Sequence, residues 1–175
     1  LEKVRAYGMR CVGPNCLGVV NTDPAVKMDG CFAESLPQRG DIGFVSQSGA
    51  LGGGILNILK DLNIGFSQFI SIGNQADVNA ETAIEYWENV NDVRQILLYM
   101  ESIQNPANFR RLASRVTKKK PILALKAGRS AAGASAASSH TGSLAGSDRA
   151  ADALLRQSGV IREQSLEKLF ATAKV

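Results

Sequence analysis

Short apolar runs alternate with longer segments of helical spacing from about residue 40 onward. Each run has the length and flanking turn residues of a buried strand, and they fall at 41–46, 65–72, 93–100, 121–126 and 160–162. The intervening segments have apolar residues three and four positions apart, and they predict helices at 48–62, 79–89, 105–120, 147–157 and 165–174. In the first helix the apolar stripe comprises Leu51, Ile55, Ile58, Leu59 and Leu62. The run at 93–100 is almost wholly apolar, so we expect a central strand.

Strands that alternate with helices are typical of a parallel sheet with right-handed crossovers. About five such units predict an α/β domain of the flavodoxin-like or Rossmann-like kind, with a doubly wound parallel sheet. Its first helix carries an N-terminal serine, Ser48, and Asn105 with Pro106 forms a typical helix start.

The first 40 residues are less regular. We expect the end of a helix at 1–7 closed by Gly8, a strand at 9–12, and a turn-rich loop from Gly13 to Gly18. Residues 21–40 have little periodicity and predict a linker, with a short hairpin around 27–32. A domain boundary is expected near Pro37, so that 1–37 is the end of one domain plus a linker and 38–175 is the next.

Composition narrows the class of protein. The 175 residues are 45% hydrophobic and 21% charged, which is typical of a globular chain, and the apolar runs are too short to cross a bilayer. The net charge of +4 is scattered except at Arg110–Arg111 and Lys118–Lys120. The lysine run is better explained as a helix end than as a nucleic-acid surface, because no aromatic residues interleave with it.

Three cysteines without a C-x-x-C pair predict neither a disulfide framework nor a metal site. The chain begins at Leu1 without a signal sequence, so we expect a fragment of a larger cytoplasmic protein with reduced thiols.

Ser130 to Asp148 is a stretch of almost entirely small residues around His140, the single histidine. Small residues cannot bury a core, so the stretch predicts a surface loop. One imidazole on such a tether is either a chance histidine in a linker or a reactive group.

Other candidate groups follow strands that should end at the same edge of the sheet. Ser48, Gly49 and Ala50 open the first helix, where free backbone N–H groups can bind an anion, although Ser48 can equally serve as a simple N-cap. Glu101 ends the central strand. It is either solvated or orients an imidazole by bonding one ring nitrogen and leaving the other free to attack phosphorus.

Three familiar motifs are absent from the first strand-to-helix turn. Residues 46–52 lack the Gly-Lys-Ser/Thr of a P-loop, the dinucleotide-binding glycines and the glycine of a nucleophile elbow. A Ser–His hydrolase that uses Ser48 and His140 is therefore a weaker alternative.

Four segments together carry a family resemblance: Gly-Pro-Asn-Cys-Leu-Gly at 13–18, Ser-Gln-Ser-Gly-Ala-Leu-Gly at 46–52, Ser-Ile-Gly-Asn at 71–74 and Ser-Ser-His-Thr-Gly-Ser-Leu-Ala-Gly at 138–146. In this order they resemble the NDP-forming acyl-CoA synthetases, which include ADP-forming acetyl-CoA synthetase and the succinyl-CoA synthetase α subunit. The resemblance implies a flavodoxin-like phosphohistidine domain preceded by the tail of a Rossmann-like CoA-binding domain.

The resemblance also implies roles for individual residues. His140 would be the phosphorylated nucleophile and Glu101 the carboxylate that orients it. Ser48, Gly49, Ala50, Thr141 and Gly142 would bind phosphate, and Gly13, Pro14 and Asn15 would face the acyl-CoA; no metal ligand is expected. The His-Thr-Gly-Ser loop favours a short-chain or less common acid over succinate.

By the same resemblance the reaction uses CoA, phosphate and ATP or ADP with Mg²⁺, bound mainly outside this chain. The expected partner is an ATP-grasp domain or subunit within an oligomer, with neither nucleic acid nor membrane involved. The isolated chain should be inactive. The competing interpretation is a non-catalytic acyl-CoA-sensing domain of a protein lysine acetyltransferase, against which the retained His140 argues.

Overall fold

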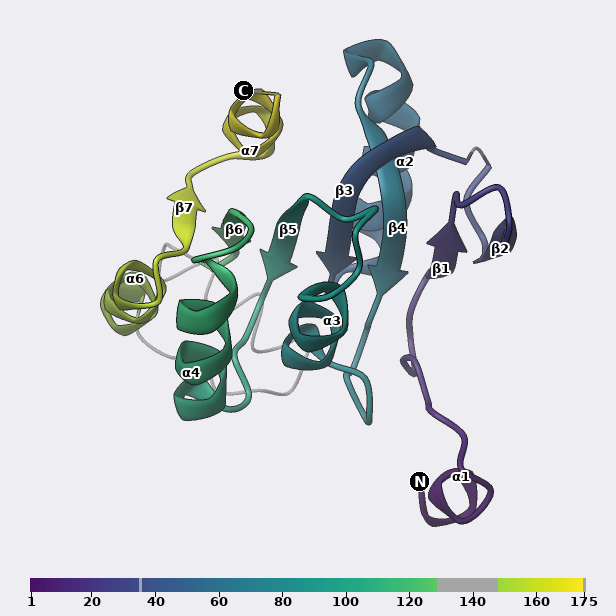
Figure 1. Cartoon of the computed structure of the whole chain (residues 1–175), viewed down its shortest axis with the longest axis horizontal. Coiled ribbons are helices and arrows are strands. Elements are labelled where there is room, and N and C mark those ends of the chain that lie inside the picture. The colour runs from purple at the N-terminus through teal and green to yellow at the C-terminus, as the bar shows by residue number, and fades with distance from the viewer. Residues whose placement is uncertain (35, 129–147, 175) are drawn as a thin grey trace.

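The apolar runs form the core strands of a seven-stranded sheet in the computed structural model, which describes residues 1–34, 36–128 and 148–174 (Figure 1). The strands are β1 (Gly18–Asn21), β2 (Met28–Cys31), β3 (Gln38–Ser46), β4 (Gly65–Ser71), β5 (Gln95–Met100), β6 (Ile122–Lys126) and β7 (Ile161–Glu163). The helices are α1 (Glu2–Ala6), α2 (Gly49–Leu62), α3 (Ala80–Trp87), α4 (Pro106–Val116), α6 (Asp148–Gln157) and α7 (Leu166–Ala173).

The sheet order is β2-β1-β4-β3-β5-β6-β7, and the five strands from β4 to β7 in that order are mutually parallel. Numbered along the chain, the five parallel strands lie in the order 2-1-3-4-5, which is the flavodoxin-like order. The second strand, β4, lies on one side of the first, β3, and the later strands lie on the other side. The predicted fold class is therefore confirmed. Strands β1 and β2 extend the sheet as an antiparallel hairpin beyond β4.

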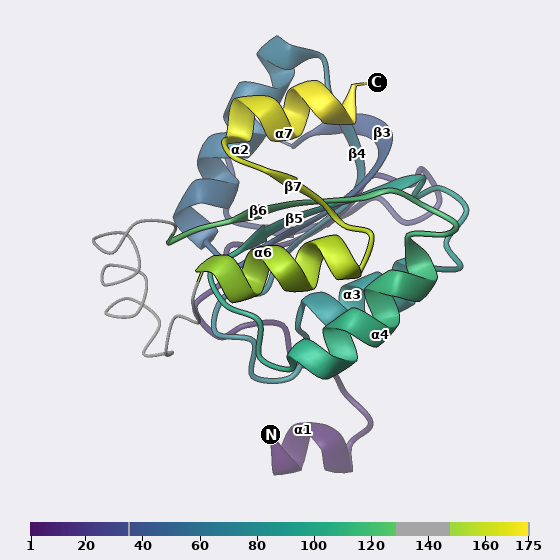
Figure 2. The same ribbon diagram turned by 90° about the vertical axis from the view of Figure 1, so that its left-hand side faces the viewer.

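Helices cover both faces of the sheet (Figure 2). Helices α2 and α7 lie on one face, where Ile55, Leu59 and Phe170 bury against Phe44 and Phe69 of the strands. The side chain of Ile58, predicted for the same stripe, lies outside the description. Helices α3, α4 and α6 lie on the other face, where Trp87 and Phe109 are fully buried. Apolar contact on both faces explains why β5 reads as a continuous apolar run.

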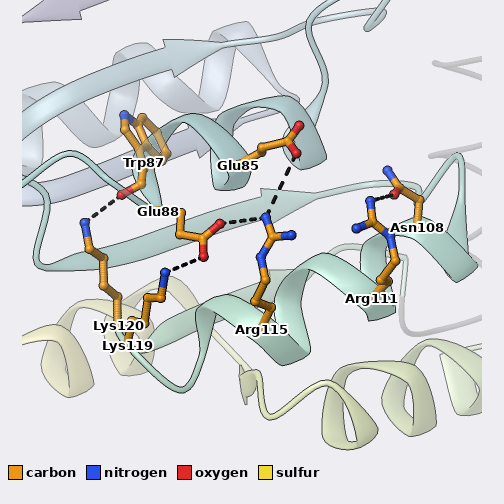
Figure 3. Close-up of polar contacts among 8 residues, drawn as sticks. All are labelled: Glu85, Trp87, Glu88, Asn108, Arg111, Arg115, Lys119 and Lys120. Atoms are coloured by element: carbon orange, nitrogen blue, oxygen red, sulfur yellow. Dashed lines mark hydrogen bonds and ion pairs between the residues drawn. The ribbon is translucent and has the colours of Figure 1, made fainter.

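A polar cluster joins the end of α3 to α4 (Figure 3). The Glu88 carboxylate accepts hydrogen bonds of 2.6 Å from both Arg115 and Lys119, and the Lys120 ammonium donates to the carbonyls of Trp87 and Val90. The side chain of Glu88 is only 7% exposed. Two of the three lysines at 118–120 thus fix one helix to another, which agrees with the helix-end interpretation.

The N-terminal region departs from prediction in two respects. Residues 9–12 do not form a strand, because their polar groups bond to the β4–α3 loop: Cys11 N donates to Asp77 and Cys11 O accepts from Val78 N. The hairpin expected around 27–32 contains only β2, and its partner is β1, which lies within the segment interpreted as loop and linker. The domain boundary near Pro37 stays a prediction.

Among the described residues, no helix has both the length and the apolar character that a membrane span requires. The same residues contain no grouping of three or more His, Cys, Asp or Glu side chains that could hold a metal ion.

Candidate functional site

The predicted site residues that the structure describes gather where the parallel sheet reverses its strand order. Strand β3 lies between β4 and β5, with Ser46 paired to Ser71 on one side and to Tyr99 on the other. The crevice at the carboxyl ends of such neighbouring strands is where open α/β sheets bind ligands. Here it places the start of α2, directly after β3, beside Glu101, directly after β5.

Gln47 holds the segment that carries Glu101. Its Oε1 accepts from the backbone N–H of Glu101 at 2.6 Å and of Ser102 at 2.9 Å, and its Nε2 donates to the Ser102 carbonyl at 2.8 Å. Gln47 is itself buried, and these three bonds give both its amide oxygen and its amide nitrogen a partner. These bonds fix the backbone after β5 relative to α2. The backbone that carries the partly exposed Glu101 side chain is therefore held in place.

The N-terminus of α2 keeps two backbone donors available. Ser48 Oγ accepts from Leu51 N at 3.3 Å and Ser48 O from Gly52 N, so Ser48 caps the helix as one interpretation predicted. Within the described part of the chain, the N–H groups of Gly49 and Ala50 have no acceptor. They point out of the first helical turn, where the partial positive charge of the helix favours an anion. Capping and anion binding are therefore compatible.

The loop at 13–18 lies directly against this helix end. Asn15, Ser48, Gly49 and Ala50 line one cavity of about 360 Å³, together with Cys16, Leu17, Phe32, Gln47 and Gly53. We call it the α2 cavity. Asn15 and the helix N-terminus are more than thirty residues apart in sequence, and the fold brings these two motifs together in one hollow.

A glycine allows the close contact between this loop and the turn after β4. Gly73 has φ +49°, and a Cβ there would lie 2.3 Å from the carbonyl oxygens of both Pro14 and Asn15. Two backbone bonds close the contact, from Asn74 N to Pro14 O and from Ala76 N to Gly13 O, each 2.9 Å long. Only a residue without a side chain fits there.

Asp77 anchors the segment before the loop. Its carboxylate accepts from Arg10 Nε at 2.8 Å and from Cys11 N at 3.0 Å. The Arg10 hydrogen bond, followed by the Cys11 N–H, holds the pKa of Asp77 below its ordinary value. The negative charge at Asp77 therefore favours the docked position of residues 9–15.

His140, Thr141 and Gly142 lie outside the described residues, so their predicted roles remain predictions. Of the other site residues, the structure places Asn15, Ser48, Gly49 and Ala50 around one cavity, with Gly13 and Pro14 bound to the adjacent turn. Glu101 is joined to that cavity through Gln47.

Sequence reasoning gave no role to three supporting groups, although two of them, Gln47 and Ser71, lie within segments that it singled out. Gln47 lies between two serines at the end of a strand, and a buried amide at such a position is a recognisable signal. Ser71 Oγ accepts from Leu17 N at 3.0 Å, and Asp77, six residues later in the chain, accepts from Cys11 N at 3.0 Å. The partners of these last two are 54 and 66 residues away, and no local pattern reveals them.

The flavodoxin-like strand order, with a helix N-terminus and a cavity at the carboxyl edge of the sheet, defines the class: a doubly wound α/β domain. Comparison with known proteins narrows the class. Residues 39–175 match the family described as succinyl-CoA ligase like flavodoxin domain. The chain belongs to this family.

Individual relatives are ADP-forming ligases by name. The chain is 42% identical over 174 residues to the α subunit of acetate–CoA ligase (ADP-forming) II from Pyrococcus furiosus, covering 99% of this chain and 37% of the relative. It is 41% identical over 172 residues to 4-hydroxybutyrate–CoA ligase (ADP-forming) from Nitrosopumilus maritimus, covering 97% and 25%. The chain therefore spans about a third or less of the length of these relatives.

A solved structure agrees with the family match and with the named relatives. The dinucleotide-forming acetyl-coenzyme A synthetase 1 of Ca. Korarchaeum cryptofilum, in complex with phosphate and ADP, superposes with a TM-score of 0.91 at 36% identity, covering 97% of this chain and 36% of that one. The predicted family resemblance is confirmed.

Proposed function

We propose that this chain is the phosphohistidine domain of an ADP-forming acid–CoA ligase. The observation that carries the proposal is the convergence, at the reversal point of a flavodoxin-like sheet, of the free N–H groups of α2, the Gly-Pro-Asn loop and the Gln47-held Glu101. The names of the relatives, which are acid–CoA ligases, support the ligase class.

In the proposed reaction, phosphate bound at the N–H groups of Gly49 and Ala50 attacks the acyl carbon of an acyl-CoA, with release of CoA and formation of an acyl phosphate. A ring nitrogen of His140 then attacks phosphorus, and the free acid leaves with the bridging oxygen. ADP takes the phosphoryl group from the histidine to give ATP, and all steps are reversible. Glu101 would bond the other ring nitrogen, which fixes the tautomer that attacks.

The remaining assignments belong to the same proposal. Thr141 and Gly142 would add donors to the phosphate, and Gly13, Pro14 and Asn15 would face the thioester. An ATP-grasp domain or subunit would supply the nucleotide with Mg²⁺, in a cytoplasmic oligomer. Residues 1–37 would end a CoA-binding domain. The acetyltransferase-linked sensing module is favoured by no observation on the described residues.

The test is phosphoryl transfer in the full-length protein. We expect incubation with radiolabelled ATP and Mg²⁺ to give a protein label that survives base and is lost in acid, as a phosphoramidate is. His140→Asn should abolish the label, and Glu101→Gln should slow its formation while leaving the protein folded. Unchanged labelling in His140→Asn would refute the proposal, and an acid-stable label would point to a different acceptor.

A further inference from the structure

A second cavity lies on the other side of the segment held by Gln47. It has a volume of about 560 Å³ and lies between α4 and α6, at the carboxyl ends of β5 and β6. We call it the α4–α6 cavity. Ser102 belongs to its lining, whereas Gln47 lines the α2 cavity, and the two residues are hydrogen bonded. The two cavities therefore flank the same backbone but are lined by different residues.

The lining of the α4–α6 cavity is mainly apolar. On the α4 side, the apolar lining comprises Ile103, Pro106 and Ala107. On the α6 side, it comprises Leu154 and several alanines. Walls of this kind favour a hydrocarbon over a hydrated ion.

Two cations interrupt these apolar walls. Lys126, the last residue of β6, is only 5% exposed, and Arg110 of α4 is exposed. Among the residues that the structure describes, the Lys126 ammonium donates to Ala127 O at 2.6 Å. It has no carboxylate within ion-pair distance among the residues described, although an ammonium has three protons to donate.

Within residues 1–34, 36–128 and 148–174, the charge of Lys126 therefore has no carboxylate at ion-pair distance. Burial is the main influence on its pKa and lowers it, while Asp148 and Glu101 lie near enough to raise it in part. Asp148 is itself bonded to Arg162, which also pairs with Asp152. A buried cation without a close counter-charge is costly, so an anion entering the cavity would be stabilised.

We propose that the α4–α6 cavity binds a short-chain organic carboxylate, whose carboxylate pairs with Lys126 and whose hydrocarbon lies against the apolar walls. An inorganic anion would lose its water there and gain few donors in return. The ligand class is that of the free acids named for the relatives. The choice of ligand class therefore rests on the proposed function, but the test measures binding without nucleotide or CoA, so it can fail independently of phosphoryl transfer to His140.

The test is calorimetric titration of the full-length protein with acetate, butyrate and hexanoate. Hexanol probes the hydrocarbon tail alone, and inorganic phosphate probes the charge alone. Each added methylene should tighten binding about fourfold. Lys126→Met should weaken hexanoate binding about tenfold or more, because a charge-assisted hydrogen bond is lost. Ala107→Phe, which fills the cavity and keeps both cations, should also weaken it.

Lys118→Met is the matched control, since Lys118 is exposed on the connection that leads from α4 into β6, and it should bind as the parent does. Circular dichroism checks that each variant is folded. Hexanoate binding in Lys126→Met and Ala107→Phe that is as tight as in the parent would overturn the proposal by placing the acid elsewhere. An affinity that does not rise from acetate to hexanoate would also overturn it. So would Lys126-dependent binding of phosphate without binding of hexanoate.

Discussion

At the scale of single residues, Gln47 is the group on which the position of Glu101 depends. Gln47→Leu should leave two backbone N–H groups and one carbonyl without their partner. We expect a loss of about 1–3 kcal/mol in the free energy of unfolding, measured by urea titration. Phosphoryl transfer to His140 should slow as well, since Glu101 loses its fixed backbone.

The control for this change is Gln38→Leu, an exposed glutamine at the start of the same strand. It should alter neither stability nor transfer by a comparable amount. If Gln47→Leu loses stability but transfers phosphoryl at the parental rate, Gln47 has a structural role only.

Gly43 tests how tightly β3 packs against α3. A Cβ at this position would lie 2.8 Å from the Cδ2 and Cε3 atoms of Trp87, whose indole N–H is fixed by a 2.8 Å bond to Gln68. Gly43→Ala should cost about 1–3 kcal/mol of unfolding free energy through overpacking. Gly54→Ala, in α2 with open space around it, should instead stabilise by about 0.5–1 kcal/mol. Equal effects in thermal unfolding would contradict the close packing.

At the scale of elements, the periodicity of apolar residues predicted the core strands and most of the helices. The helices that begin at Asn79, Asn105 and Ser165 do so because each side chain accepts from the N–H three residues on. The prediction was wrong where contacts with residues distant in the sequence determine the local structure. Residues 9–12 have the apolar look of a strand, but Asp77 and Val78 take their backbone groups.

The same division holds for the candidate site. Ser48, Gly49, Ala50 and Glu101 could be proposed because strand ends at one edge follow from a parallel sheet. The Gln47 bonds and the contact of Gly73 with Pro14 and Asn15 could not, because they depend on the register in which distant segments meet.

Glu88 gives the α3–α4 pair a pH dependence. Hydrogen bonds from Lys119 first, and then from Arg115, lower the pKa of Glu88. A carboxyl whose folded pKa is depressed adds stability that is fully present above its unfolded pKa, near 4.3, and is lost as the pH falls through the lower folded value. The parent protein should therefore lose part of its stability below about pH 5.

Glu88→Gln should lose less unfolding free energy in acid than the parent does. The unfolding free energies of parent and variant should therefore converge as the pH falls from about 7 to 3. Glu85→Gln is the control, because Glu85 is exposed and lies 4.0 Å from Arg115. A gap between parent and Glu88→Gln that stays constant with pH would show that the ion pairs do not contribute.

At the scale of the whole molecule, the α2 cavity exists only while residues 9–17 are docked on the flavodoxin-like domain. Asp77 holds this segment through Arg10 and Cys11, and the turn at Gly73 holds it further along. Asp77→Ala removes the first of these anchors. Local opening of a segment held by few buried apolar contacts needs less free energy than global unfolding, so the variant should open more often at 9–12.

Limited trypsin digestion of the full-length protein measures this opening at the bond after Arg10, read by mass spectrometry. We expect cleavage several-fold faster in Asp77→Ala than in the parent, and faster in the parent as the pH falls through the depressed pKa of Asp77. Asp92→Ala, which removes a 3.6 Å exposed ion pair to Arg39, is the control and should cut at the parental rate. If Asp77→Ala also cuts at that rate, the Gly73 contact alone holds the loop, and Asn15 keeps its place in the cavity without Asp77.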